Sequence, residues 1–117
     1  MVRYAQDMDA LARQKLVTLI QEMGSQARVA QALDVDRSRV TRWLADEEPD
    51  TDNLIKLESV EFVLSRLLRS YRRETALKWL TGFNAHLGDA RPIDLLARGR
   101  TWEVIRAIEA DETGAYA

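Results

Sequence analysis

Apolar residues in the first quarter of the chain recur at intervals of three and four positions, the spacing of one helix face. They are Ala12, Leu16, Leu19, Ile20 and Met23. After them, Gly24 suits the left-handed position that ends a helix, and Ser25 suits the N-cap of the next one. The pattern predicts a first helix ending near Met23 and a short second helix from Gln26 to Leu33.

A third helix is predicted between Asp36, which can cap it, and about Ala45. Its inward-facing apolar residues are Val40, Trp43 and Leu44. The segment that follows, residues 46–52, holds five acidic residues, one proline and no basic residue. We expect this acidic segment to be a loop, because it lacks apolar periodicity and contains a proline.

A longer helix is predicted from about Asn53 to Tyr71. Its apolar residues alternate spacings of three and four, as in a heptad pattern. They are Leu57, Val60, Leu64, Leu67 and Tyr71. Phe62, Val63 and Leu68 widen this stripe. Two heptads are fewer than the three or four typical of a coiled coil, so a buried central helix and a dimer seam both stay open.

The last third of the chain also has helical spacing. A helix is predicted from about Glu74 to Thr81, and Pro92 and Gly99 suit the start and the exit of the next one. Thr101 can cap a final helix. Its predicted apolar face is formed by Trp102, Val104, Ile105 and Ile108. No segment shows strand alternation, so the fold class predicted from the pattern is all-α.

Composition agrees with a folded protein outside a membrane. Apolar residues make up 46% of the chain and charged residues 31%, and there is no cysteine. We expect a cytoplasmic protein without membrane contact, because no apolar run approaches the ~18 residues of a membrane span and no signal peptide precedes the first helix. The charges alternate by segment: 26–45 and 66–78 are basic, and 46–52 and the end are acidic. Such segregation suits either several charged partners or solvated helix faces.

Nothing in the sequence supports catalysis. His86 is the one histidine, and we expect it to be solvent-exposed or locally hydrogen-bonded. There is no glycine-rich phosphate loop and no paired-ligand metal spacing. We therefore expect a protein that is not an enzyme, with no cofactor and no metal site.

The stretch "SQARVAQALDVDRSRVTRWLAD" has the spacing of a helix-turn-helix. Ala30 lies where the two helices come closest, and Val35, Val40 and Trp43 pack the second against the first. This packing turns the start of the second helix outward. The polar residues there are Arg37, Ser38, Arg39, Thr41 and Arg42. Arginine, serine and threonine bind base edges or phosphates.

The amide end of the preceding helix, near Gln26, is a natural site for a backbone phosphate. The stretch resembles the Xre/Cro-type helix-turn-helix of phage-repressor-like regulators. That resemblance implies DNA contacts by Gln26, Arg37, Ser38 and Thr41, in a dimer whose recognition helices lie about one helical turn apart. Arg39 and Arg42 complete the expected DNA-binding set. A helix pair with an exposed basic face and no DNA is the alternative.

One position departs from the helix-turn-helix pattern. Asp34 occupies the turn position that usually holds glycine. Aspartate tolerates the left-handed conformation at a modest cost, so the fold is retained. However, Asp34 and Asp36 place negative charge close to the expected phosphates, which weakens binding.

The C-terminal part resembles the toxin-binding domain of antitoxins of the Xre/MbcA/ParS group, the partners of RES-domain toxins. The residues that carry the resemblance are Trp79-Leu80, Asn84, Leu87-Gly88, Arg91-Pro92, Asp94-Leu95-Leu96, Gly99, Val104, Ile108 and Gly114. With the upstream helix-turn-helix, the resemblance covers most of the chain. It implies a helix-turn-helix bundle over residues 1–50, joined by a long helix to a small helical toxin-binding domain within 51–117.

The resemblance implies a type II antitoxin that neutralises an NAD-consuming RES toxin by placing its C-terminal end in the toxin's active site. A second implied role is repression of its own operon, as a homodimer or a larger hetero-oligomer with the toxin. The expected toxin-binding residues are Arg91, Trp102, Glu109, Glu112, Gly114, Ala115, Tyr116 and Ala117.

The residues of the chain end suit this role. Gly114 can stop the last helix, and Tyr116 offers a flat ring for a nucleotide pocket, with Glu109, Asp111 and Glu112 complementing its arginines. A Tyr116 folded back over its own core is the alternative for the tail. For the whole chain, the alternative is a stand-alone Xre-type transcriptional regulator that binds DNA.

Overall fold

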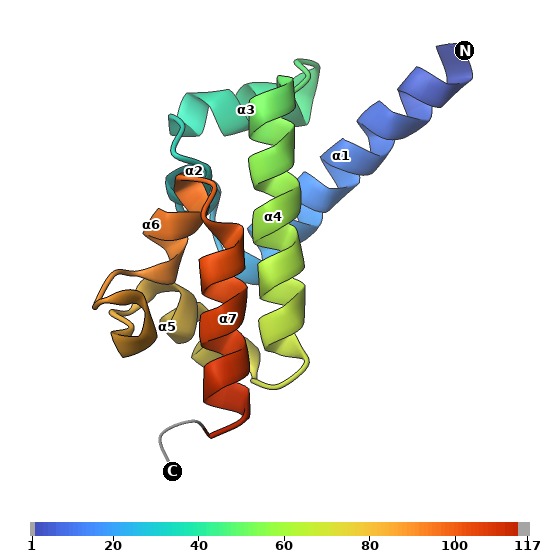
Figure 1. The fold of residues 1–117 in the computed structure, drawn as a ribbon. Coiled ribbons are helices and arrows are strands. Elements are labelled where there is room, and N and C mark those ends of the chain that lie inside the picture. Colours follow the sequence, from blue (N-terminus) through green and yellow to red (C-terminus); the bar gives the residue numbers. More distant parts are fainter. Residues whose placement is uncertain (1, 115–117) are drawn as a thin grey trace. The chain divides into compact units, whose positions relative to one another are not determined.

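The computed structural model describes residues 2–114, with side chains from residue 10 onward. Its elements are α1 (Val2–Met23), α2 (Gln26–Leu33), α3 (Arg37–Ala45), α4 (Thr51–Leu68), α5 (Arg73–Thr81), the 3-10 turn η1 (Ala85–Leu87), α6 (Pro92–Ala97) and α7 (Thr101–Glu112) (Figure 1). Residues 2–114 contain no β-strand beyond one isolated bridge between Asn84 and Ala90. The predicted all-α class is confirmed. No helix among these residues is long and apolar enough to cross a membrane.

The chain divides into two compact units between Glu58 and Ser59, within α4. The first turns of α4 belong to the N-terminal unit because they contact it: Lys15 Nζ lies 3.3 Å from Glu58 Oε2, and Lys56 Nζ donates to the Leu33 carbonyl at 3.3 Å. The domain boundary expected after residue 50 stays a prediction.

In the N-terminal unit, α1 packs against α2 and α3, and α2 packs against α3. The core residues are Ala12, Leu16, Leu19, Met23, Val29, Ala30, Ala32, Leu33, Val40, Trp43 and Leu57. The predicted break between α1 and α2 is confirmed. Gly24 has φ 96°, and Ser25 Oγ accepts a hydrogen bond from the Arg28 backbone N–H at 3.1 Å.

The turn between α2 and α3 is built without glycine. Asp34 adopts the left-handed conformation (φ 55°, ψ 50°), as expected, and the Val35 N–H donates to the Ala30 carbonyl at 3.0 Å. Asp36 is the N-cap residue of α3, but its side chain makes no capping hydrogen bond. Asp36 therefore occupies the expected N-cap position of α3, but its carboxylate does not make the expected capping hydrogen bond.

In the C-terminal unit, α6 packs against α5 and α7, and η1 packs against α7. The core residues are Val60, Val63, Leu64, Leu67, Ala76, Leu80, Ile93, Leu95, Leu96, Val104, Ala107 and Ile108. Val60, Leu64 and Leu67 are buried within this chain itself, which favours the buried-helix alternative over a dimer seam. Pro92 opens α6 and Gly99 follows its end with φ 78°, as predicted.

Several boundary and burial predictions were wrong. The fourth helix spans Thr51–Leu68 rather than 53–71, because the Asp50 carboxylate accepts the Asn53 N–H at 2.9 Å and starts the helix earlier. Thr101 is the first residue of α7, and Arg100 is its N-cap. Phe62 and Trp102 are 54% and 75% exposed, so neither belongs to the buried stripe assigned to it.

Candidate functional site

The start of α2 and the exposed face of α3 are joined by one hydrogen bond. The Thr41 hydroxyl lies 2.9 Å from Gln26 Oε1 and donates to it. Arg37 and Ser38 are exposed, and they lie four and three positions before Thr41, so the three residues share one face of α3. The structure thus brings together Gln26, Arg37, Ser38 and Thr41 of the expected DNA-binding set.

The other two arginines of that set face a different partner. Arg42 Nε lies 3.5 Å from Glu47 Oε1. Arg39 lies 4.0 Å from Glu47 Oε2 through Nε and 4.0 Å from Asp50 Oδ2 through Nη2. The acidic loop was expected but its contact with these arginines was not, although five acids directly after a basic helix are a signal for it.

This acidic loop, Asp46 to Asp50, is fixed to the helices at both ends. The N–H groups of Asp46 and Glu47 donate to the Arg42 carbonyl at 3.1 and 3.0 Å. At the other end, the hydrogen bond from the Asn53 N–H lowers the pKa of the Asp50 carboxyl below its ordinary value, and the charges of Arg39 and Lys56 lower it further. The loop therefore presents the carboxyl groups of Glu47 and Asp50 to α3.

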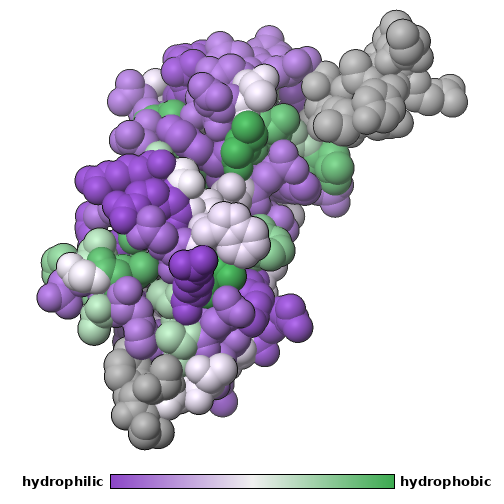
Figure 2. All heavy atoms as spheres, in the orientation of Figure 1, coloured by the Kyte–Doolittle hydropathy of each residue, from purple (hydrophilic) through white to green (hydrophobic). Residues whose placement is uncertain are grey.

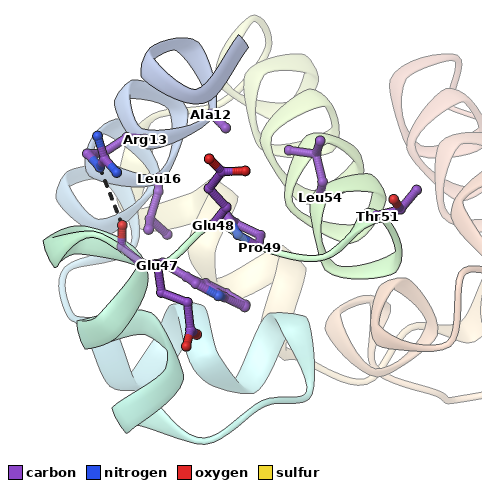
Figure 3. A pocket seen from close by; sticks show the side chains of 9 residues that line it. Ala12, Arg13, Leu16, Glu47, Glu48, Pro49, Thr51 and Leu54 are labelled. Carbon is purple, nitrogen blue, oxygen red and sulfur yellow. Dashed lines mark hydrogen bonds between the residues drawn. The ribbon is translucent and has the colours of Figure 1, made fainter. Parts of the chain in front are cut away.

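A pocket of about 230 Å³ lies between the acidic loop, α1 and the start of α4 (Figure 3). It is lined by Ala12, Arg13, Leu16, Trp43, Glu47, Glu48, Pro49, Thr51 and Leu54. Arg13 Nε donates to the Trp43 carbonyl at 3.4 Å and so ties α1 to α3. The pocket has apolar walls, with carboxylates carried by the loop, and the lining residues do not form a constellation for nucleophilic or acid–base catalysis.

The predicted toxin-binding residues of the C-terminal unit differ in how available they are. Trp102 and Glu109 are exposed on α7. Gly114 has φ 66° and follows the end of α7, as expected for a helix stop. Ala115, Tyr116 and Ala117 lie outside the described residues. The structure therefore leaves both alternatives for Tyr116 as predictions.

The remaining two residues of that set make ion pairs within the chain. Arg91 is bonded to Asp94 through Nε at 3.0 Å and through Nη2 at 3.3 Å. Glu112 Oε2 accepts from Arg66 Nη1 at 2.5 Å and from the Ser70 hydroxyl at 2.6 Å. These two bonds lower the pKa of Glu112 below its ordinary value, and the bond from Arg66 has the larger effect. Glu112 thus holds α7 to the end of α4.

Asp111 forms a second tether of α7. Its carboxylate accepts a hydrogen bond from the Trp79 indole N–H of α5, and its Oδ1 lies 3.2 Å from His86 Nε2 in η1. His86 is exposed, as expected, and it also meets a partner distant in sequence. Asp111 was expected to face the arginines of a partner, but it contacts its own chain.

No group of three or more His, Cys, Asp and Glu side chains within the described part of the chain is arranged to hold a metal ion. On the face shown in Figure 2, hydrophilic side chains predominate and hydrophobic ones form small separate areas. Beyond Trp102 and Phe62, the exposed large apolar residues are Leu11, Val17, Ile55 and Phe83.

Comparison with known proteins bears on the fold. No protein-family model and no curated protein matches this chain. Among solved structures, it is similar to a chain of the crystal structure of the M. tuberculosis MbcT–MbcA toxin–antitoxin complex. The two chains share 24% sequence identity with a TM-score of 0.75, over 90% of this chain and 96% of that chain. The fold implied by the resemblance to Xre/MbcA/ParS antitoxins is therefore confirmed.

Proposed function

We propose that the protein is an antitoxin that binds and neutralises a protein toxin. The observation that carries this proposal is the similarity of fold, over 90% of the chain, to a chain of a toxin–antitoxin complex. The C-terminal residues that resemble those of Xre/MbcA/ParS antitoxins support the same function independently of the fold comparison.

The resemblance also supports a particular class of partner. We propose a RES-domain toxin that consumes NAD, and a contact surface on the C-terminal unit that includes Trp102, Glu109 and the residues after Gly114. Trp102 is 75% exposed, and a large exposed aromatic side chain is a typical anchor of a protein interface. The exposed carboxylate of Glu109 would complement the basic groups that a dinucleotide site requires.

Co-expression with a RES-domain protein encoded beside it tests this proposal. The antitoxin should restore growth and cellular NAD to cells that express the toxin, and the two proteins should co-purify. Toxin expressed alone and toxin expressed with a stop codon in the antitoxin are the controls. A chain that neither co-purifies with the toxin nor restores NAD would disprove the proposal.

A second role, binding of operator DNA, is supported by the α2–α3 surface. The Gln26–Thr41 hydrogen bond and the exposed Arg37 and Ser38 form a polar face at the start of α3. We propose that this face reads DNA upstream of the protein's own coding sequence, in a dimer or in the toxin complex. If the chain binds this DNA and no toxin, the stand-alone regulator is the better description.

The DNA role is tested by fluorescence anisotropy with the upstream duplex. Affinity should fall steeply with salt, and Arg37→Ala should weaken binding and sequence preference. Arg98→Ala removes an arginine of the C-terminal unit that is also exposed, and it should leave binding unchanged. Equal losses of DNA affinity in both variants would indicate non-specific electrostatic attraction and would exclude sequence recognition by α3.

A further inference from the structure

The acidic loop and the basic face of α3 form an electrostatic contact within one unit of the chain. Glu47 reaches both Arg39 and Arg42, and Asp50 reaches Arg39, at distances of 3.5 to 4.0 Å. We propose that the acidic loop competes with DNA phosphate for Arg39 and Arg42, so that these arginines add little to DNA affinity until the loop releases them. The inference rests on the DNA-binding role proposed above.

Carboxylate and phosphate are alternative partners for the same guanidinium group, because both bind it through charge-assisted hydrogen bonds. DNA that approaches Arg39 or Arg42 therefore has to replace Glu47 or meet its negative charge. Arg37, which makes no ion pair among the described residues, is not restrained in this way. The loop thus restrains Arg39 and Arg42 and leaves Arg37 available.

The ion pairs are of a kind that exchanges readily. The four side chains involved are between 42% and 58% exposed. Exposed pairs of this geometry are individually weak and are screened by salt. The loop should therefore reduce DNA affinity in a graded manner rather than abolish it.

The loop is also placed independently of these ion pairs. Backbone hydrogen bonds from Asp46 and Glu47 to the Arg42 carbonyl hold its start, and the Asp50 cap holds its end. Glu47→Gln keeps these bonds and removes only the charge that faces the arginines. Asp50 is unsuitable for the test, because its substitution also removes the cap of α4.

The test compares Glu47→Gln with Asp52→Asn in the full chain on a non-specific DNA duplex. Asp52 lies close to the same loop and makes no ion pair in the described residues. Each substitution replaces one carboxylate by an amide, so the two variants carry the same net charge. We expect Glu47→Gln to bind about fivefold more tightly than Asp52→Asn at about 50 mM salt. For Glu47→Gln, the slope of log affinity against log salt concentration should be steeper by about one to two, because two arginines gain phosphate contacts.

A double-mutant cycle gives the second readout. Arg42→Ala should cost little affinity in the wild-type chain and about threefold or more in the Glu47→Gln chain, whereas Arg37→Ala should cost the same in both. If Glu47→Gln and Asp52→Asn bind alike while the wild type binds DNA, the restraint is disproved and the DNA role stands. If neither wild type nor Glu47→Gln binds DNA at low salt, both ideas are wrong, and the toxin role is unaffected.

Discussion

The Thr41 hydroxyl donates a hydrogen bond to the side-chain oxygen of Gln26, and this bond joins the first residue of α2 to the middle of α3. Both residues were expected to contact DNA. The structure makes them one unit, since the Gln26 amide is oriented by Thr41. The N–H₂ group of Gln26 is left to donate to an external acceptor such as phosphate.

Gln26→Ala and Thr41→Val should therefore have non-additive effects on DNA affinity. Each should weaken binding about threefold to tenfold, and the double variant should be little weaker than the worse single one, because Thr41 acts partly by orienting Gln26. Ser38→Ala removes a hydroxyl that takes no part in this bond. Its effect on DNA affinity should therefore add fully to that of Gln26→Ala or of Thr41→Val. Anisotropy titrations on the upstream duplex measure all of these values. Full additivity of Gln26→Ala and Thr41→Val would contradict the coupling.

The two N-caps of the helix-turn-helix should differ in their contribution to stability. Ser25 accepts a hydrogen bond from the Arg28 N–H, whereas Asp36 makes no capping hydrogen bond. Ser25→Ala should lower the free energy of unfolding by about 1 kcal/mol, the usual value of a lost cap. Asp36→Ala should cost less than about 0.5 kcal/mol. Urea unfolding followed by circular dichroism provides the measurement, and equal losses would contradict the structure.

Local rules predicted the helix boundaries best where a single residue decides the backbone. Gly24, Ser25, Pro92 and Gly99 each occupy the position that their conformational preference or capping ability indicates. Asp34 could be predicted in the left-handed turn for the same reason. The backbone conformation at such positions depends on a few neighbouring residues, so the amino-acid sequence is sufficient to predict it.

Contacts between distant residues could not be predicted in this way. The acids of residues 46–52 were recognised as a loop, but their contact with Arg39 and Arg42 depends on the direction in which the chain leaves α3. His86 and Asp111 are likewise joined only once η1 packs against α7. Trp102 fitted the apolar period of α7, yet it lies in the first turn, before Val104, the first buried residue of that helix. The period alone therefore overestimated its burial.

The ion pair of Glu112 with Arg66 should make stability depend on acidity. Because the pKa of Glu112 is lowered in the folded chain, its contribution is present above the ordinary carboxyl value of about 4.3 and is lost as the pH falls through the lowered value. Glu112→Gln should thus lower the urea midpoint at pH 7 and have a smaller effect in acid. Glu109→Gln, an exposed residue of the same helix, is the matched control. An effect of Glu112→Gln that is equal at both pH values would contradict this prediction.

The exposed indole of Trp102 should matter for the partner and not for the fold. Trp102→Ala should change the free energy of unfolding by less than about 0.5 kcal/mol, because the side chain is 75% exposed. It should weaken toxin binding about thirtyfold or more, about 2 kcal/mol or above, if the ring is buried in the complex. Phe83→Ala removes a ring that is 82% exposed in the same unit and that the resemblance does not assign to the interface. Calorimetric titration against the toxin should separate the two variants, and equal affinities would remove Trp102 from the contact surface.

The residues after Gly114 provide the test of how the toxin is blocked. Gly114 follows the end of α7 and has a left-handed conformation that only glycine adopts readily. Deletion of Ala115–Ala117 should keep co-purification with the toxin, because the helical surface remains, and should restore NAD hydrolysis in the purified complex. Tyr116→Ala, which keeps the chain length, should have the same effect if the ring occupies the active site, whereas Ala115→Ser should not. A truncated chain that still blocks NAD hydrolysis at equal occupancy would show that neutralisation depends on the helices alone.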